Sequence, residues 1–150
     1  MFRGNHPAKV DEKGRLKLPA AFKQLLDAQN VTQLYITSTD GVSAEIWALP
    51  EWEKRESLLA DFTMDVDVAK YLNLTSYYGQ QVEMDTQARV ILPQILRNSA
   101  RLDAEVTVRG MIDHLVVHNM AQVEQGLPES ALTADDRRSL AAKLSRKSSD

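Results

Sequence analysis

The spacing of hydrophobic positions changes several times along this chain, and each change marks the boundary of a predicted element. In residues 15–18 leucines alternate with basic residues, the period of two that is typical of a half-buried strand. Pro19 ends this strand and suits the first turn of a helix. Apolar residues then recur at the spacing i, i+3, i+4, so a helix is predicted over residues 20–29.

Two further strands and a second helix complete the first half of the pattern. The sequence predicts a strand over residues 34–37, a turn at Asp40 and Gly41, and a returning strand over residues 44–49. A helix follows over residues 50–61. The first half therefore reads as strand, turn, strand, helix, strand, strand and helix, which predicts an α+β protein.

The same order returns in the second half, after a linking helix predicted over residues 65–78. One short pattern occurs in both halves, in residues 10–19 and 84–93. Each copy has an Asp, an Arg four residues later, two aliphatic residues at alternate positions and then a Pro. A repeated Asp-x-x-x-Arg between strand signals predicts a charged hairpin tip, which favours binding over catalysis.

These patterns divide the chain into four predicted segments. Residues 1–62 form the first half, 63–79 a helical linker, 80–126 the second half, and 127–150 a C-terminal helix with a frayed tail.

The first tip has the composition of a tight turn. Asp11 at its first position can accept backbone N–H groups, and Gly14 at its fourth accommodates a positive φ. Lys13 and Arg15 then stand at the tip, where the guanidinium fork suits a phosphate or the O6/N7 edge of guanine. The alternative is that Asp11 and Arg15 simply pair with each other, an exposed ion pair of little consequence for stability.

The second tip differs in its middle. It keeps Asp85 and Arg89, but Ala88 replaces the glycine, so this turn either avoids a positive φ or carries strain of about 1 kcal/mol. Thr86 and Gln87 give a tip without the lysine, which can still donate hydrogen bonds to a base or a phosphate. A smaller electrostatic contribution is expected from this tip.

Charge is distributed unevenly. The chain has a net charge of −3, but residues 1–25, which include Arg3 and Lys9, carry +4 and the remainder −7. A basic end on an acidic body indicates a face directed at a polyanion, and a cluster of solvated lysines is the alternative.

Length and composition limit the remaining classes. In 150 residues, 43% of them hydrophobic, there is enough material for a core. The absence of cysteine excludes disulfides and thiolate metal sites and suits a reducing compartment. Without a signal-like N-terminus or a long apolar stretch, a cytoplasmic protein with no membrane partner is expected.

Catalytic interpretations have little support. His114 and His118 have a metal-like spacing but lie on an apparent strand without a third ligand nearby. Asp61, Asp65 and Asp67 lack the glycine and terminal Glu of a calcium loop. Because no phosphate-binding loop or nucleophile elbow is present either, neither an enzyme nor a cofactor is predicted.

Taken together, the motifs resemble the MraZ family of bacterial transcriptional regulators. The resemblance rests on the opening Met1-Phe2-x-Gly4, on both Asp-x-x-x-Arg copies and on Leu49-Pro50-x-Trp52. It implies two AbrB-like (swapped-hairpin, double-psi) β-barrel halves with peripheral helices, related by a pseudo-twofold axis within one chain. It also implies a homo-oligomeric ring that binds direct repeats in the promoter of a division and cell-wall gene cluster.

The hypothesis is therefore a nucleoid-associated, sequence-specific regulator that binds double-stranded DNA through its tips. An oligomeric protein-interaction scaffold built on the same hairpins is the alternative. The predicted DNA-binding residues are Lys13, Arg15, Arg89, Arg3, Lys9 and Gln87, and the predicted turn residues are Asp11, Gly14, Asp85 and Ala88.

Overall fold

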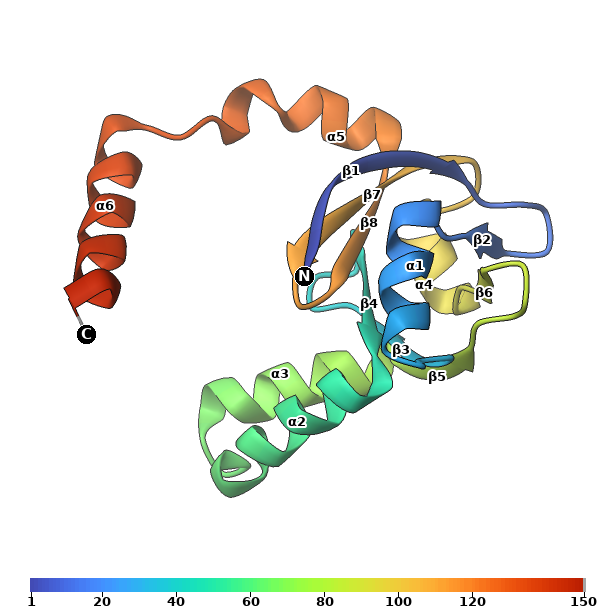
Figure 1. Ribbon diagram of the computed structural model, residues 1–150, viewed down its shortest axis with the longest axis horizontal. Helices are drawn as coiled ribbons and strands as arrows, with labels where there is room; N and C mark the ends of the chain where they lie inside the picture. Colours follow the sequence, from blue (N-terminus) through green and yellow to red (C-terminus); the bar gives the residue numbers. More distant parts are fainter. Residues whose placement is uncertain (150) are drawn as a thin grey trace.

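A six-stranded antiparallel sheet forms the body of the protein (Figure 1), seen in a computed structural model that describes residues 1–149. Its strands lie in the order β1, β7, β8, β4, β3, β5. A separate pair, β2 with β6, lies beside it. The strands are β1 (Phe2–Lys9), β2 (Arg15–Lys17), β3 (Gln33–Thr37), β4 (Ala44–Ala48), β5 (Gln80–Glu83), β6 (Arg89–Ile91), β7 (Glu105–Ile112) and β8 (Leu115–Asn119).

The two halves of the sequence exchange strands. The first strand of each half pairs with a strand of the other, β1 with β7 and β5 with β3. The β2–β6 pair also joins the halves, and β4 pairs with β8 in the middle of the sheet, where Glu45 lies opposite Val116. Equivalent strands of the two halves, β1 and β5, β7 and β3, and β8 and β4, therefore lie at equal distances from the two edges of the sheet. Neither half forms the sheet alone.

Helices α1 (Ala20–Ala28) and α4 (Gln94–Ser99) occupy equivalent places in the two halves and share one core with the strands. The alternating leucines of β2 are buried, and so are their counterparts Val90 and Leu92. Phe22 and Leu96 fill the core from the two helices. Burial of these equivalent apolar side chains is what holds the interlocked halves together.

The remaining helices lie outside this core. Helix α2 (Leu49–Leu59), the short 3₁₀ helix η1 (Ala60–Phe62) and α3 (Val66–Tyr77) form a hairpin, here called the arm, that projects from the sheet (Figure 1). Tyr35 stacks on Trp52 with ring centroids 4.8 Å apart, and this contact anchors the arm. Helix α5 (Met120–Gly126) and η2 (Pro128–Ser130) lead to α6 (Ala134–Ser149), which stands apart from the body.

The predicted order of elements is confirmed, and most boundaries differ by one or two residues. The strand expected over 44–49 ends at Ala48, because Pro50 favours a helical first turn that begins at Leu49. Strand β7 extends over eight residues because it pairs with β1 along its whole length. Of the tail that was expected to fray, Ser148 and Ser149 belong to the last turn of a helix that spans Ala134–Ser149, and Asp150 lies outside the described residues. The four-segment division stays a prediction.

In the part of the chain that the structure describes, no helix is both long and apolar enough to cross a membrane.

Candidate nucleic-acid interface

The first tip (residues 11–15) is built around one carboxylate. Asp11 Oδ1 accepts hydrogen bonds from the backbone N–H groups of Lys13 at 3.0 Å and Arg15 at 2.8 Å. Its Oδ2 accepts a third from Arg15 Nε at 2.7 Å. The N–H of Gly14 donates to the Asp11 carbonyl at 3.0 Å, and Gly14 has φ +80°. The carboxylate therefore fixes both the turn and the direction of the arginine.

The second tip (residues 85–89) repeats these contacts atom for atom. Asp85 Oδ1 accepts from the N–H groups of Gln87 at 2.8 Å and Arg89 at 2.9 Å, and Oδ2 accepts from Arg89 Nε at 3.0 Å. Ala88 has φ +63°. Of the two possibilities that the sequence left open, this turn is the strained one and does not avoid a positive φ.

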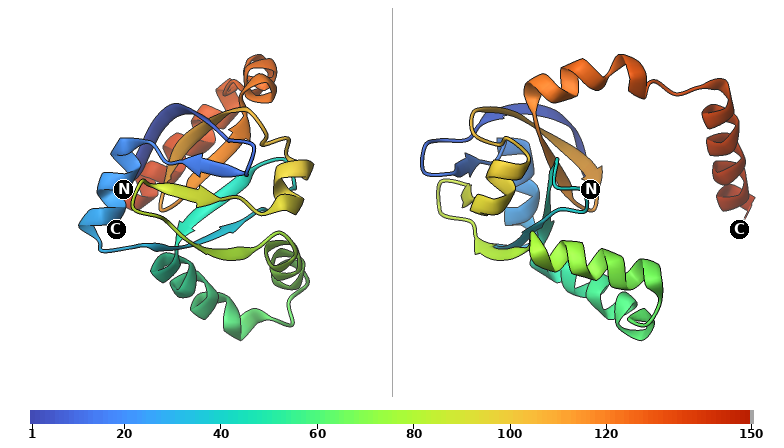
Figure 2. Two further views of the ribbon diagram at one scale, coloured as in Figure 1. Left: turned by 90° about the vertical axis from the view of Figure 1, so that its right-hand side faces the viewer. Right: turned by 180° about the vertical axis from the view of Figure 1, so that it is seen from behind.

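Hydrogen bonds tie the two tips to each other. The N–H of Leu18 donates to the Ala88 carbonyl at 2.8 Å, and the N–H of Leu92 donates to the Gly14 carbonyl at 2.9 Å. Because β2 and β6 also pair, both tips emerge from the same end of the molecule (Figures 1 and 2). The end-on view of Figure 2 shows the two hairpins side by side.

The ion pair that was the alternative to a binding role forms in both tips, but it does not occupy the whole guanidinium group. Arg15 uses Nε to hold Asp11, and within residues 1–148 its two Nη atoms make no hydrogen bond. Its side chain is 32% exposed. Arg89 is held in the same way and is equally exposed. Pairing therefore orients the arginine and leaves its terminal nitrogens available to an acceptor outside the protein.

Both carboxylates are stabilised in their charged form. The backbone N–H of Arg15 is the main cause that lowers the pKa of Asp11, and the guanidinium of Arg15 adds to it. The N–H and guanidinium of Arg89 lower the pKa of Asp85 in the same way. Each tip thus keeps an ionised carboxylate beside its arginine at neutral pH.

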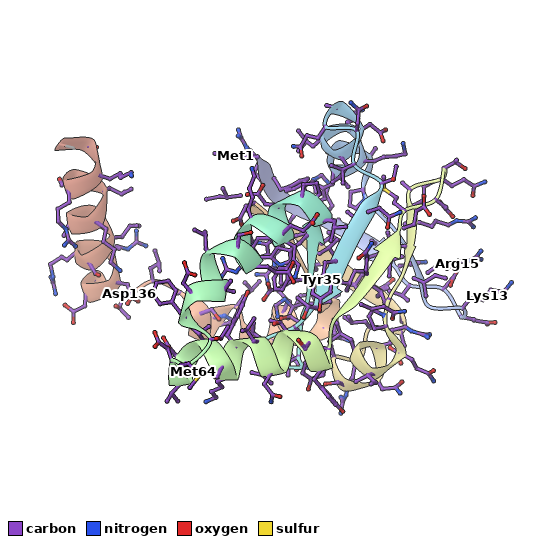
Figure 3. All side chains as sticks on the ribbon, turned by 90° about the horizontal axis from the view of Figure 1, so that it is seen from below. Met1, Lys13, Arg15, Tyr35, Met64 and Asp136 are labelled. Carbon is purple, nitrogen blue, oxygen red and sulfur yellow. The ribbon has the colours of Figure 1, made fainter. Side chains whose placement is uncertain are left out.

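Lys13 and Arg15 point away from the body in Figure 3. Gln87 is exposed at the second tip, where Arg89 is the one basic residue of the turn. The two tips consequently differ in charge although their backbones match.

The structure places the two basic residues of β1 differently. Lys9 ends β1 directly before the first tip and lies opposite Glu105. Arg3 lies opposite Met111, six residues earlier on the same strand, which corresponds to about 20 Å. Lys9 is thus brought to the end that carries the tips and Arg3 is not.

Arg97 contributes to this end, and the sequence alone gave it no role. It belongs to the second half of the chain but packs on the first tip, because a Cβ built on Gly14 would stand 2.3 Å from Arg97 Cζ. Its Nε donates to the Leu92 carbonyl at 3.1 Å. The equivalent residue, Lys23, instead pairs with Asp27 at 2.6 Å. The sequence held one indication of this contact. Gly14 lacks a side chain in the first half, and Arg97 is the larger cation at the position that Lys23 has in the first half.

The histidines considered as metal ligands have other partners. His114 stacks on Trp47 with ring centroids 4.3 Å apart, and His118 Nδ1 accepts from Arg109 Nη2 at 2.6 Å. Burial and, second, the charge of Arg109 lower the pKa of His118. Over the described part of the chain, no three His, Cys, Asp or Glu side chains are arranged to hold a metal ion.

Comparison with known proteins points to one family. A model of the family described as "MraZ protein, putative antitoxin-like" matches residues 1–70 and 79–143. A "Transcriptional regulator MraZ" from Acidobacterium capsulatum is 52% identical over 142 residues, which cover 94% of this chain and 97% of the relative. One from Koribacter versatilis is 43% identical and covers 93% and 97%. One from Acidithiobacillus ferrooxidans is 34% identical and covers 81% and 85%.

The family match spans both Asp-x-x-x-Arg turns, and these relatives extend over nearly the same length as this chain. The resemblance inferred from the motifs is thereby confirmed, and the chain belongs to the MraZ family.

Proposed function

We propose that this protein regulates transcription by binding double-stranded DNA sequence-specifically through its two tips. The observation that carries this proposal is a pair of arginines on two tips at the same end of the molecule. Each is held by a carboxylate through Nε, is partly exposed, and makes no hydrogen bond through its terminal nitrogens within residues 1–148. Such a guanidinium suits a guanine edge or a phosphate. The name of the relatives, transcriptional regulator, supports the same role.

The proposal includes the architecture of the family's DNA-binding unit. The exchange of β1 and β5 between the halves supports two AbrB-like swapped-hairpin halves related by a pseudo-twofold axis. In this arrangement the two tips of one chain act as the two tips of a dimeric hairpin protein.

Roles within the interface follow from position. Arg15 and Arg89 are proposed to read base edges, because the turns fix their direction. Lys13, Lys9 and Gln87 are proposed to contact phosphates beside them. Arg3 lies at the other end of β1, so any contribution from it would be to DNA that extends beyond the tips.

One chain offers few cationic contacts, so assembly is part of the proposal. A chain with a net charge of −3 and one well-charged tip suggests non-specific affinity of about 10⁻⁴ to 10⁻⁶ M. A ring of copies would present several tips to direct repeats, and avidity would then raise affinity by about 10² to 10⁴. The repeats are proposed to lie upstream of a division and cell-wall gene cluster, which would place the protein on the nucleoid.

Repeat spacing tests this function. DNA with two or more repeats about 10 bp apart should bind far better than a single repeat, and insertion of about 5 bp should abolish the gain by turning one site away. Light scattering should show an oligomer. A stable monomer that binds one repeat as tightly as two would contradict the proposal.

A protein-interaction scaffold remains the second candidate, supported by the exposed apolar surface of the arm. Salt separates the two functions. Binding through phosphates should weaken steeply between about 50 and 200 mM salt through counterion release, whereas a contact with an apolar centre should change little.

A further inference from the structure

The outer end of the arm carries a cluster of exposed apolar side chains. Met64 is 93% exposed and Val66 85%, and Leu58 and Phe62 are exposed beside them along the same short stretch of chain. Single exposed apolar residues are ordinary, but a group of this kind marks an interaction surface. Residues 56–68 also contain four acidic residues and no Lys or Arg, so the surface is acidic as well as apolar.

Helix α6 has the complementary character. Its residues carry a net charge of +3, with five cations after residue 136. Leu140 and Leu144 are one helical turn apart on one face, and Lys143 and Lys147 lie beside them. All described side chains of α6 are exposed. Most of the stability of helices in proteins comes from tertiary packing of an apolar face, so we expect α6, with 16 residues, to pack its leucines on another surface.

The chain does not supply that surface from its own arm in this conformation. Helix α6 stands away from α2 and α3 in Figures 1, 2 and 3, beyond the extended connection that follows η2. The chain thus carries a basic helix on an extended segment and an acidic apolar patch elsewhere. Two different complementary surfaces on one chain suit a heterologous, head-to-tail contact between copies.

We propose that α6 of one copy packs its Leu140–Leu144 face on the outer end of the arm of a second copy. The leucines would cover Met64 and Val66, and the lysines would face Asp61 and Asp65. Because every copy has one helix and one arm, the contact can propagate and close into a ring.

This arrangement leaves the DNA-binding end free. Met64 and Asp136 lie on the side of the molecule away from Lys13 and Arg15 in Figure 3. The inference deepens the proposed assembly and rests on it, since it names the segments that join neighbouring copies.

Cross-linking in the full-length protein tests the contact, because the chain has no cysteine of its own. Protein with Leu144→Cys is mixed with protein with Met64→Cys under mild oxidation, and the linked peptides are identified by mass spectrometry. A disulfide between the two different chains is expected. Ala142→Cys is the matched control, because this residue lies on the opposite face of α6 and should link far less.

Either of two results would overturn the inference. They are the absence of the Leu144–Met64 link and equal linking by the Ala142 control. If the mixture fails to link while light scattering still shows an oligomer, only this interface is wrong. If the wild type is a monomer at every concentration, the proposed ring is wrong as well.

Charge reversal gives a second readout. Lys143→Glu with Lys147→Glu should raise the protein concentration needed for assembly by about tenfold or more, because like charges then face each other. Adding Asp61→Lys and Asp65→Lys should restore assembly. Failure of this rescue, with all variants folded by circular dichroism, would count against the pairing. Binding of a single DNA repeat should be unaffected throughout.

Discussion

The two tips reach one backbone geometry with different side chains. In both, an Asp accepts the N–H groups two and four residues later and holds the arginine through Nε. The fourth position is Gly14 in one tip and Ala88 in the other, yet both have positive φ. The carboxylate, and not the glycine, is therefore what specifies the turn.

The two tips differ in the charge of their side chains and in the residues that pack against them. The first has Lys13 and is packed from the other half by Arg97, whereas the second has Gln87, and its equivalent cation Lys23 is paired with Asp27. A duplicated motif can thus keep its shape while one copy becomes the stronger electrostatic contact.

The largest expected difference is in DNA binding. Arg15→Ala should remove most operator affinity, because each lost bidentate contact costs about 1–3 kcal/mol and a ring repeats the loss. Arg89→Ala should cost less, since its tip contributes less charge. Fluorescence anisotropy with operator DNA measures both, and circular dichroism checks folding. Wild-type affinity in Arg15→Ala would show that the tip does not read DNA.

The fourth position of the turn should tolerate alanine less well in the first tip than in the second. Gly14→Ala should destabilise the fold by about 1 kcal/mol or more, because φ is +80° and the new Cβ would meet the Arg97 guanidinium. Arg97→Ala in the same chain should recover the steric part of this loss. Urea unfolding measures each step, and no recovery would mean that the guanidinium simply moves aside.

Removal of either aspartate should affect the two tips alike. Asp11→Ala and Asp85→Ala should lower the urea midpoint at pH 7 by similar amounts, because each removes the same three hydrogen bonds. Folding lowers both pKa values, so the stabilisation is present above the ordinary Asp range and is lost as pH falls through it toward the lowered pKa.

The deficit of each variant relative to wild type should therefore shrink between pH 5 and pH 2. Unequal losses at pH 7 would show that the turns are not energetically equivalent.

The smallest effect is expected from Ala88→Gly. Glycine relieves about 1 kcal/mol of strain at φ +63°, but it also removes a buried methyl group worth about 0.8 kcal/mol and raises the entropy of the unfolded chain. The net change in unfolding free energy should stay within about 0.5 kcal/mol. A loss well above 1 kcal/mol in urea titration would mean that the buried methyl outweighs the strain.

Local sequence patterns predicted much of the secondary structure. The alternation of Leu16 and Leu18 with basic residues, and the helical spacing after Pro19, are properties of short segments, so the elements formed where they were expected. The Asp-x-x-x-Arg turns were also predictable, because every contact that makes them lies within five residues. The doubled motif carried the family assignment.

The partners of these elements were decided by the tertiary structure. The sequence did not show that Arg97 would pack on Gly14, that Ala88 would accept a positive φ, or that Arg3 would lie far from the tips. The first and the last depend on residues tens of positions apart, which meet only when strands of one half pair with strands of the other. Local periodicity specifies which face of an element is buried, but the element that covers it is chosen by the packing of the whole chain.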